Sequence, residues 1–168
     1  RVAHPVGSHQ GIGNPFSITP DFRLMAQAFW PDQVRVFDLT SGKELWKTNA
    51  SRENIYTVAL SNDGRLLATA GAGDDSIIRV WNSLDGLLVA SFDKFPGGVI
   101  QLLFCPDNRT LISANTDQTV RVWDVSNPAS VPPPRNLIGH QLEVWQLSLM
   151  PDGKTLVSGG KDGSVRFW

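Results

Sequence analysis

The sequence predicts an all-β protein made of four similar units, each of which is a small antiparallel sheet. Turn-forming pairs recur along the chain, and alternating apolar runs flank each of them. No window of about 11 residues or more has the apolar spacing of a helix. The turn pairs are Pro20-Asp21, Asn62-Asp63, Pro106-Asp107 and Pro151-Asp152, spaced 42, 44 and 45 residues apart. A period of this length is typical of repeat architectures and therefore governs the fold prediction.

Each unit is expected to form antiparallel strands that follow one another along the chain. One strand comes after the turn pair, at 24–29, 66–71, 111–116 and 156–160. The next alternates strictly, at 34–38, 78–82, 120–124 and 165–168. A weaker last strand follows a turn in the first three units, at 44–48, 87–92 and 135–138. In the third unit, the proline-rich SNPASVPPP at 126–134 replaces the tight turn.

A four-stranded sheet has two faces and cannot bury both of them alone. Neighbouring sheets must therefore stack, and stacking around an axis produces a β-propeller. The predicted fold is a propeller of about four four-stranded antiparallel blades.

Composition excludes several functional classes. The 168 residues are 41% hydrophobic and 18% charged, as in ordinary globular proteins. A net charge of -1 argues against nucleic acid or an anionic membrane as a partner. The single cysteine, Cys105, excludes an intrachain disulfide and fits a reducing compartment, so a cytoplasmic location is expected. No apolar stretch approaches the roughly 18 residues of a membrane span, and RVAHPVGSHQ at the N-terminus lacks a signal-peptide core.

The units resemble repeats of the WD-repeat (Trp-Asp repeat) β-propeller family. The fourth unit matches from IGHQ at 138–141 through LMPDGKTLVSGGKDGSVRFW, and the third carries SANTDQTVRVWD. The second carries LLATAG and DDSIIRVWN, and WPDQVRVFD in the first is a diverged copy. The resemblance covers nearly the whole chain. It is highly specific for the fold and much less so for any particular function.

The resemblance implies where the blades begin and end. They are expected at 7–49, 50–93, 94–138 and 139–168, the last without its fourth strand. Residues 1–6 are expected to form the fourth strand of a preceding or closing blade. Because rings of this family usually have seven blades, an arc of a larger ring is favoured over a closed four-bladed ring. Such an arc has exposed edges through which the isolated segment is expected to self-associate.

The resemblance also implies a buried polar network in each blade. In the family it links a His, a Ser or Thr, an Asp and a Trp, and it acts as structural glue. The positions are His140, Ser158, Asp162 and Trp168 in the fourth unit; Ser113, Asp117 and Trp123 in the third; and Thr69, Asp75 and Trp81 in the second. Phe95 and Ser51 stand at the His position of the third and second units. The first unit has His9 and Asp32, but Gln27 and Phe37 replace the hydroxyl and the indole.

A Ser, a His and an Asp together also suggest a hydrolase triad. The structural interpretation is favoured because a Trp completes the set and no nucleophile-elbow motif surrounds Ser158. No catalytic residue and no cofactor are predicted. GIG at 11–13 and GAG at 71–73 are interpreted as turns, since neither opens a helix. His4, His9 and His140 lie too far apart for a recognisable zinc spacing, so no metal is predicted.

Four arginines precede the aromatic position of the third strand by two residues: Arg35, Arg79, Arg121 and Arg166. A basic ring that grips phosphate or an acidic partner is one interpretation. Period two places each Arg on the same strand face as that aromatic residue, so packing or stacking against it is favoured.

Function is expected on the narrower face of the propeller, where partners commonly dock in this family. The matching positions are Glu143, Trp145 and Lys161; Gly98, Ile100 and Thr116; and Asn54, Tyr56 and Asp74; Trp30 lies near the corresponding turn of the first unit. Trp145, Tyr56 and Ile100 are expected to be neighbours that form a protein-binding hot spot. The alternative is that they pack on the adjacent loops.

Two classes of function remain. The favoured one is a non-catalytic scaffold that binds a peptide or protein. The other is a sensory or regulatory segment of a larger multidomain enzyme, such as a bacterial protein kinase, protease-like or ATPase protein, because propellers that this chain resembles are often fused to such domains.

Overall fold

The computed structural model describes residues 14–52, 54–71, 76–92 and 96–168. These residues form fifteen strands in four antiparallel sheets, and no helix is present among them. The first sheet contains β1 (Phe16–Ile18), β2 (Leu24–Phe29), β3 (Gln33–Asp38) and β4 (Lys43–Asn49). The second contains β5 (Ile55–Leu60), β6 (Leu66–Gly71), β7 (Ile78–Asn82) and β8 (Leu88–Phe92). The third contains β9 (Val99–Phe104), β10 (Thr110–Asn115), β11 (Thr119–Asp124) and β12 (Arg135–Ile138), and the fourth β13 (Val144–Leu149), β14 (Leu156–Gly160) and β15 (Val165–Phe167).

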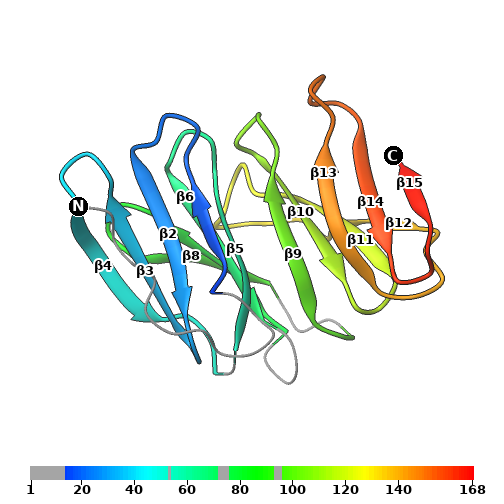
Figure 1. Ribbon diagram of the computed structural model, residues 1–168, viewed down its shortest axis with the longest axis horizontal. Helices are drawn as coiled ribbons and strands as arrows, with labels where there is room; N and C mark the ends of the chain where they lie inside the picture. The colour runs from blue at the N-terminus through cyan, green and yellow to red at the C-terminus, as the bar shows by residue number, and fades with distance from the viewer. Residues whose placement is uncertain (1–13, 53, 72–75, 93–95) are drawn as a thin grey trace.

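The four sheets stand in a row, each stacked on the next (Figure 1). The first strands of neighbouring sheets lie beside one another, β1 against β5, β5 against β9 and β9 against β13. The first and fourth sheets lie at opposite ends of the row (Figure 1). The described residues therefore form an open arc of propeller blades rather than a closed ring, and the predicted all-β fold is confirmed.

The recurring turn pairs lie between the first and second strands of every sheet. In each turn the Asp carboxylate accepts the backbone N–H two residues later, an Asx-type bond that shapes the turn. The residue after the Asp has a positive φ: Phe22 at 58°, Gly64 at 69°, Asn108 at 58° and Gly153 at 65°. Gly and Asn adopt this left-handed conformation readily, but Phe does so only with strain.

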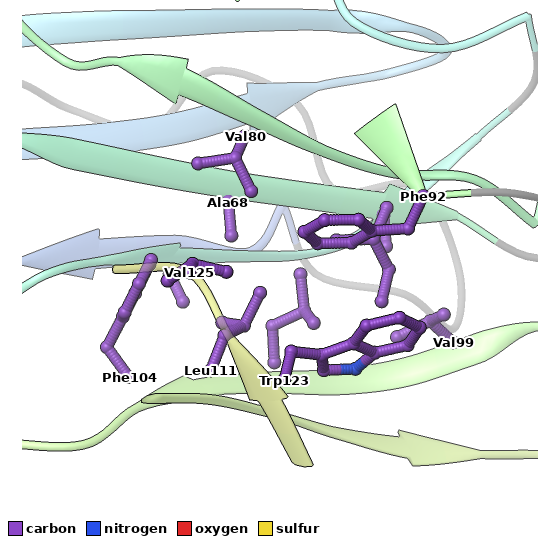
Figure 2. Packing of buried hydrophobic residues seen from close by; sticks show 12 residues of the cluster. Ala68, Val80, Phe92, Val99, Phe104, Leu111, Trp123 and Val125 are labelled. Carbon is purple, nitrogen blue, oxygen red and sulfur yellow. The ribbon is translucent and has the colours of Figure 1, made fainter. Parts of the chain in front are cut away.

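Three apolar clusters fill the spaces between the sheets, and all three are built alike. Small branched residues of one sheet face the Trp of the next sheet. Val34 and Val36 pack with Trp81, Ile78 and Val80 with Trp123, and Val120 with Trp168. Between the second and third sheets, Phe92 also stacks on Trp123 with ring centroids 4.7 Å apart (Figure 2). Because side chains alternate along each third strand, one set of them faces the preceding sheet and the other set faces the following sheet.

At each end of the arc, the outer sheet has one face that no other sheet covers among the described residues. On the fourth sheet, Val165 and Phe167 are 62% and 67% exposed, whereas the equivalent Ile78 and Val80 are fully buried. On the first sheet, Phe16 is 63% exposed. The face of the fourth sheet is therefore an apolar surface of the kind that a neighbouring blade covers, and Phe16 is an exposed apolar side chain at the other end.

Several sequence-based predictions lie outside the described residues. They are the strand at 1–6, His4 and His9, the glycines at 11–13, and Asp74, Asp75 and Phe95. Cys105 is buried, and burial raises the pKa of its thiol to about 11. The described part of the chain holds no helix long and apolar enough to cross a membrane.

Candidate functional site

A chain of hydrogen bonds runs through the fourth sheet. The indole Nε1 of Trp168 donates to Ser158 Oγ at 2.9 Å, and Ser158 Oγ lies 2.8 Å from His140 Nε2. His140 Nδ1 lies 3.1 and 3.2 Å from the two carboxylate oxygens of Asp162. Because an ionised carboxylate only accepts, Nδ1 carries the proton, and Nε2 accepts the proton of Ser158. The four residues implied by the family resemblance are thus brought together.

The Asp162 carboxylate fastens the loop before β13 to the turn between β14 and β15. It accepts the backbone N–H of Gln141 at 2.8 Å, and both the hydroxyl and the N–H of Ser164, at 2.7 and 2.9 Å. These bonds, with that from His140, hold the pKa of Asp162 well below its ordinary value of 3.8. The carboxylate therefore stays ionised and locks the loop in place.

The same geometry argues against Ser158 as a nucleophile. Its side chain is fully buried in the sheet. Its hydroxyl donates to His140 and accepts from Trp168, so both roles are already taken inside the blade. Burial of this oxygen and its bond from the indole disfavour a role as a nucleophile.

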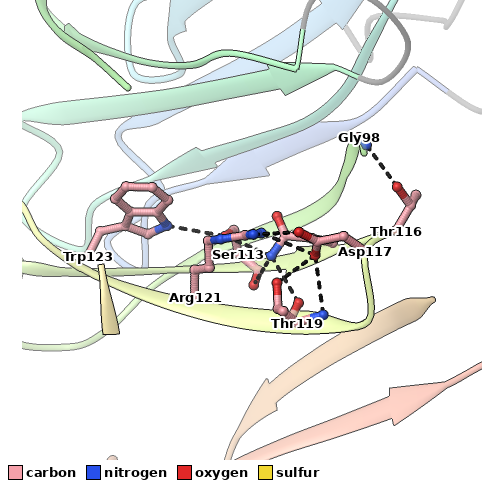
Figure 3. Close-up of polar contacts among 8 residues, drawn as sticks. Gly98, Ser113, Thr116, Asp117, Thr119, Arg121 and Trp123 are labelled. Atoms are coloured by element: carbon pink, nitrogen blue, oxygen red, sulfur yellow. Dashed lines mark hydrogen bonds and ion pairs between the residues drawn. The ribbon is translucent and has the colours of Figure 1, made fainter. Parts of the chain in front are cut away.

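The third sheet keeps only part of this network. Trp123 Nε1 donates to Ser113 Oγ at 3.2 Å, as the resemblance implies (Figure 3). Asp117 does not join that chain. Its carboxylate instead forms an ion pair with Arg121 and accepts the hydroxyl of Thr119 at 2.5 Å (Figure 3). Arg121 is thus an ion-pair partner of this Asp, whereas in the fourth sheet His140 is the partner of Asp162.

In the second sheet, Trp81 Nε1 donates to Thr69 Oγ1 at 2.9 Å. In the first sheet, Asp32 accepts a hydrogen bond from Asn49 at 2.9 Å, and Gln27 and Phe37 are half-buried on the outward face.

Two of the four arginines have partners other than the aromatic residue that follows them on the strand. Arg35 lies over the ring of Phe29, 4.6 Å from its centroid, and pairs with Glu44 at 3.4 Å. Arg121 pairs with Asp117, as above. Carboxylates therefore neutralise two of the four guanidinium groups, which disfavours a basic ring that grips an anion.

The expected binding residues of the fourth sheet form one cluster. Trp145 is 51% exposed, and its Nε1 donates to Glu143 Oε2 at 3.1 Å. Lys161 Nζ lies 3.3 Å from the same oxygen and 6.0 Å from the Trp145 ring centroid. Hydrogen bonds from Trp145 and then Lys161 lower the pKa of Glu143 below its ordinary value. We call Glu143, Trp145 and Lys161 the tryptophan cluster.

Tyr56 and Ile100 lie on the first strands β5 and β9, and both are half-buried. They line a groove of about 580 Å³ that runs along the first strands of the first three sheets. Trp145 is not part of its lining, so the groove and the tryptophan cluster are separate features.

The remaining expected positions differ in exposure. Trp30 is 68% exposed, and Asn54 is half-buried. Thr116 is tied down, since its Oγ1 accepts the backbone N–H of Gly98 at 2.8 Å (Figure 3).

A set of hydrogen bonds that the sequence patterns did not predict joins neighbouring first strands. Thr57 Oγ1 accepts the N–H of Leu102 at 2.9 Å. Gln101 accepts the N–H of Leu147 at 2.6 Å and donates to its carbonyl at 3.3 Å. Ser17 makes the equivalent bond to Leu60 N in the first pair of sheets. The sequence signal for these bonds is a polar residue that lies a few positions before the turn pair. These bonds hold consecutive sheets in fixed relative positions.

Among the described residues, no group of three or more His, Cys, Asp or Glu side chains is placed to hold a metal ion.

Comparison with known proteins gives matches to relatives that are longer than this chain. WD repeat-containing protein sll1491 of Synechocystis is 30% identical over 68% of the chain and 32% of its own length. Target of rapamycin complex subunit LST8 of Saccharomyces cerevisiae is 30% identical over 67% of the chain and 36% of its own length. Periodic tryptophan protein 2 of Arabidopsis thaliana is 35% identical over 55% of the chain and 10% of its own length. The chain thus spans about a third or less of these relatives.

The family model described as WD domain, G-beta repeat matches three stretches, residues 42–82, 86–124 and 132–168. Each stretch begins at or just before the last strand of one sheet and ends at the third strand of the next, so every repeat links two neighbouring blades. Together the three matches cover well over half of the sequence, and the chain belongs to the WD-repeat family.

Proposed function

We propose that this chain is part of a non-catalytic scaffold that binds a peptide or protein through the tryptophan cluster. The observation that supports this most strongly is the half-exposed Trp145, whose indole is held by Glu143 while Glu143 is paired with Lys161. Large amphipathic side chains of this kind dominate the binding energy of protein interfaces.

The cluster is organised before a partner arrives. Lys161 N also donates to the carbonyl oxygen of Glu143 at 2.9 Å, which fastens the β14–β15 turn to the loop before β13. Asp162 and His140 lie directly beneath this junction and lock the same loop. A rigid aromatic anchor loses little conformational freedom on binding, so more of the contact energy remains as affinity.

The groove lined by the first strands is proposed as a second part of the binding surface. Tyr56 and Ile100 line it, and the bonds from Thr57 and Gln101 to neighbouring strands stiffen its floor. An extended peptide that begins at Trp145 and continues along the first strands would contact Ile100 and then Tyr56. Asn54, Thr116 and Trp30 are proposed as contacts at the rim.

The relatives support an assembly role. By their names, the yeast relative is a subunit of a complex, and a rice relative that is 29% identical over 67% of this chain, RACK1y, is a protein of the small ribosomal subunit. For this chain we propose the same general role, in the cytoplasm, with a protein partner. The four units are proposed as blades with boundaries at 49/50, 93/94 and 138/139, in a larger ring whose further blades cover the apolar end faces.

Affinity capture with matched variants tests this function. Wild-type protein is compared with Trp145→Ala, which removes the anchor, and with Leu87→Ala, which removes an exposed apolar residue from a turn outside the cluster. The proposal requires a protein that is enriched by wild type and Leu87→Ala and lost with Trp145→Ala, while thermal unfolding of both variants stays close to that of wild type. Equal recovery by both variants would exclude the cluster as the binding surface.

A further inference from the structure

The connection between β11 and β12 differs from its counterparts in the other sheets. The third and fourth strands are joined by residues 39–42 in the first sheet and 83–87 in the second, which are ordinary hairpin lengths. In the third sheet the same connection spans residues 125–134 and contains four prolines. Closing the hairpin does not require this additional length, so the segment calls for another explanation.

The conformation of Val131 to Pro134 follows from its sequence. Proline fixes φ near −65°, and a residue that precedes proline is excluded from the helical region. Pro132 and Pro133 are subject to both restrictions, and Val131 precedes the first proline. These restrictions favour an extended polyproline II conformation for the segment before any partner binds.

The structure presents this segment as a ridge. Val131 packs against the apolar cluster between the second and third sheets and anchors it, whereas Pro132 and Pro133 are exposed. Both prolines line a hollow of about 420 Å³ on one side, beside Phe92 and Trp123. They also line a second hollow of about 410 Å³, together with Asp107 and Asp124. A ridge between two hollows is accessible from both sides.

A positive charge follows the ridge directly. Arg135 begins β12 and is exposed, and it forms no ion pair within the described part of the chain. An exposed guanidinium next to a polyproline II segment gives a partner both a direction of binding and a charge to recognise.

We propose that Val131–Arg135 is a docking site for a second protein, a domain whose groove is lined by aromatic side chains and carries a carboxylate for Arg135. Such grooves bind preformed polyproline II segments because little chain entropy is lost. This site lies at the end of the sheets that carries the turn at 106–109, whereas Lys161 lies at the opposite end. The chain would then hold two partners on opposite faces, and this second site does not depend on the proposed function above.

The test is titration of the full chain with a panel of purified SH3 and WW domains, which are the probes for this chemistry. At least one domain is expected to bind. The double substitution Pro132→Ala/Pro133→Ala should weaken the affinity for that domain by about tenfold or more. Arg135→Gln should weaken the affinity to a smaller extent. Asn127→Ala, at an exposed position of the same loop that lines neither hollow, and Trp145→Ala should leave the affinity unchanged.

A second measurement does not depend on how the variants fold. A synthetic peptide of residues 127–137 should compete with the full chain for the bound domain, and the peptide with both proline substitutions should not. Absence of binding by every domain in the panel overturns the proposal. It is equally overturned if the double substitution leaves the affinity unchanged, because the segment would then be only a spacer.

Discussion

Replacing Ser158 by Ala should destabilise the protein by about 2–4 kcal/mol. The substitution removes one fully buried oxygen that serves two partners. The indole N–H of Trp168 loses its acceptor at 2.9 Å, and Nε2 of His140 loses its donor at 2.8 Å. Each buried polar group left without a partner costs about 1–3 kcal/mol, and the two costs overlap because the residues form one network.

Urea unfolding followed by tryptophan fluorescence measures this loss, and Ser113→Ala is its matched control. Ser113 Oγ accepts from Trp123 at 3.2 Å and from Asn115 at 3.3 Å. Asn115 keeps two carbonyl acceptors, at 3.1 and 2.9 Å, so Ser113→Ala removes the hydroxyl acceptor of only one indole N–H and the loss should be smaller. A loss below about 0.5 kcal/mol for Ser158→Ala, as at an ordinary surface position, would refute the structural role of the network.

Three further changes test the account. Phe22→Gly should raise the free energy of unfolding by about 1 kcal/mol, since Phe22 is 73% exposed and strained at a φ of 58°; a drop in urea midpoint would contradict this. Phe167→Ser should weaken self-association of the arc about tenfold or more, as measured by sedimentation, because burying a Phe side chain contributes roughly 1.5–3 kcal/mol. Leu87→Ser, at an exposed turn position, should leave self-association unchanged. Lowering the pH below about 4 should destabilise the wild type more than Asp162→Asn. The folded state lowers the pKa of Asp162, so the carboxylate contributes its full stabilisation above its ordinary pKa of 3.8 and loses it as the carboxylate becomes protonated. Parallel pH profiles of stability for the two proteins would argue against this role.

The sheets and their turns could be predicted from the sequence because both depend on local chemistry. Alternation with period two fixes which residues share a face, and an Asp that accepts the N–H two residues later fixes each turn. The bond from Trp168 to Ser158 was implied by the resemblance to the WD-repeat family.

Details that depend on the relative positions of side chains could not be predicted. The resemblance placed Asp117 in a set with Ser113 and Trp123, but it did not predict the charge-assisted ion pair of Asp117 with Arg121. The hydrogen bond from the Trp145 indole to Glu143 was likewise not predicted. Both outcomes depend on rotamers and loop geometry that a repeat pattern does not specify.

The most direct test of the scaffold proposal is site-specific photo-crosslinking. A photoreactive amino acid is placed at Leu142, which is exposed beside Glu143, in one protein and, as a control, at the exposed Leu87 in another. A discrete crosslinked partner is expected from position 142 that is absent from position 87 and disappears when Trp145→Ala is added. The same crosslinked species from both positions, or one from position 142 that persists in Trp145→Ala, would contradict the proposal.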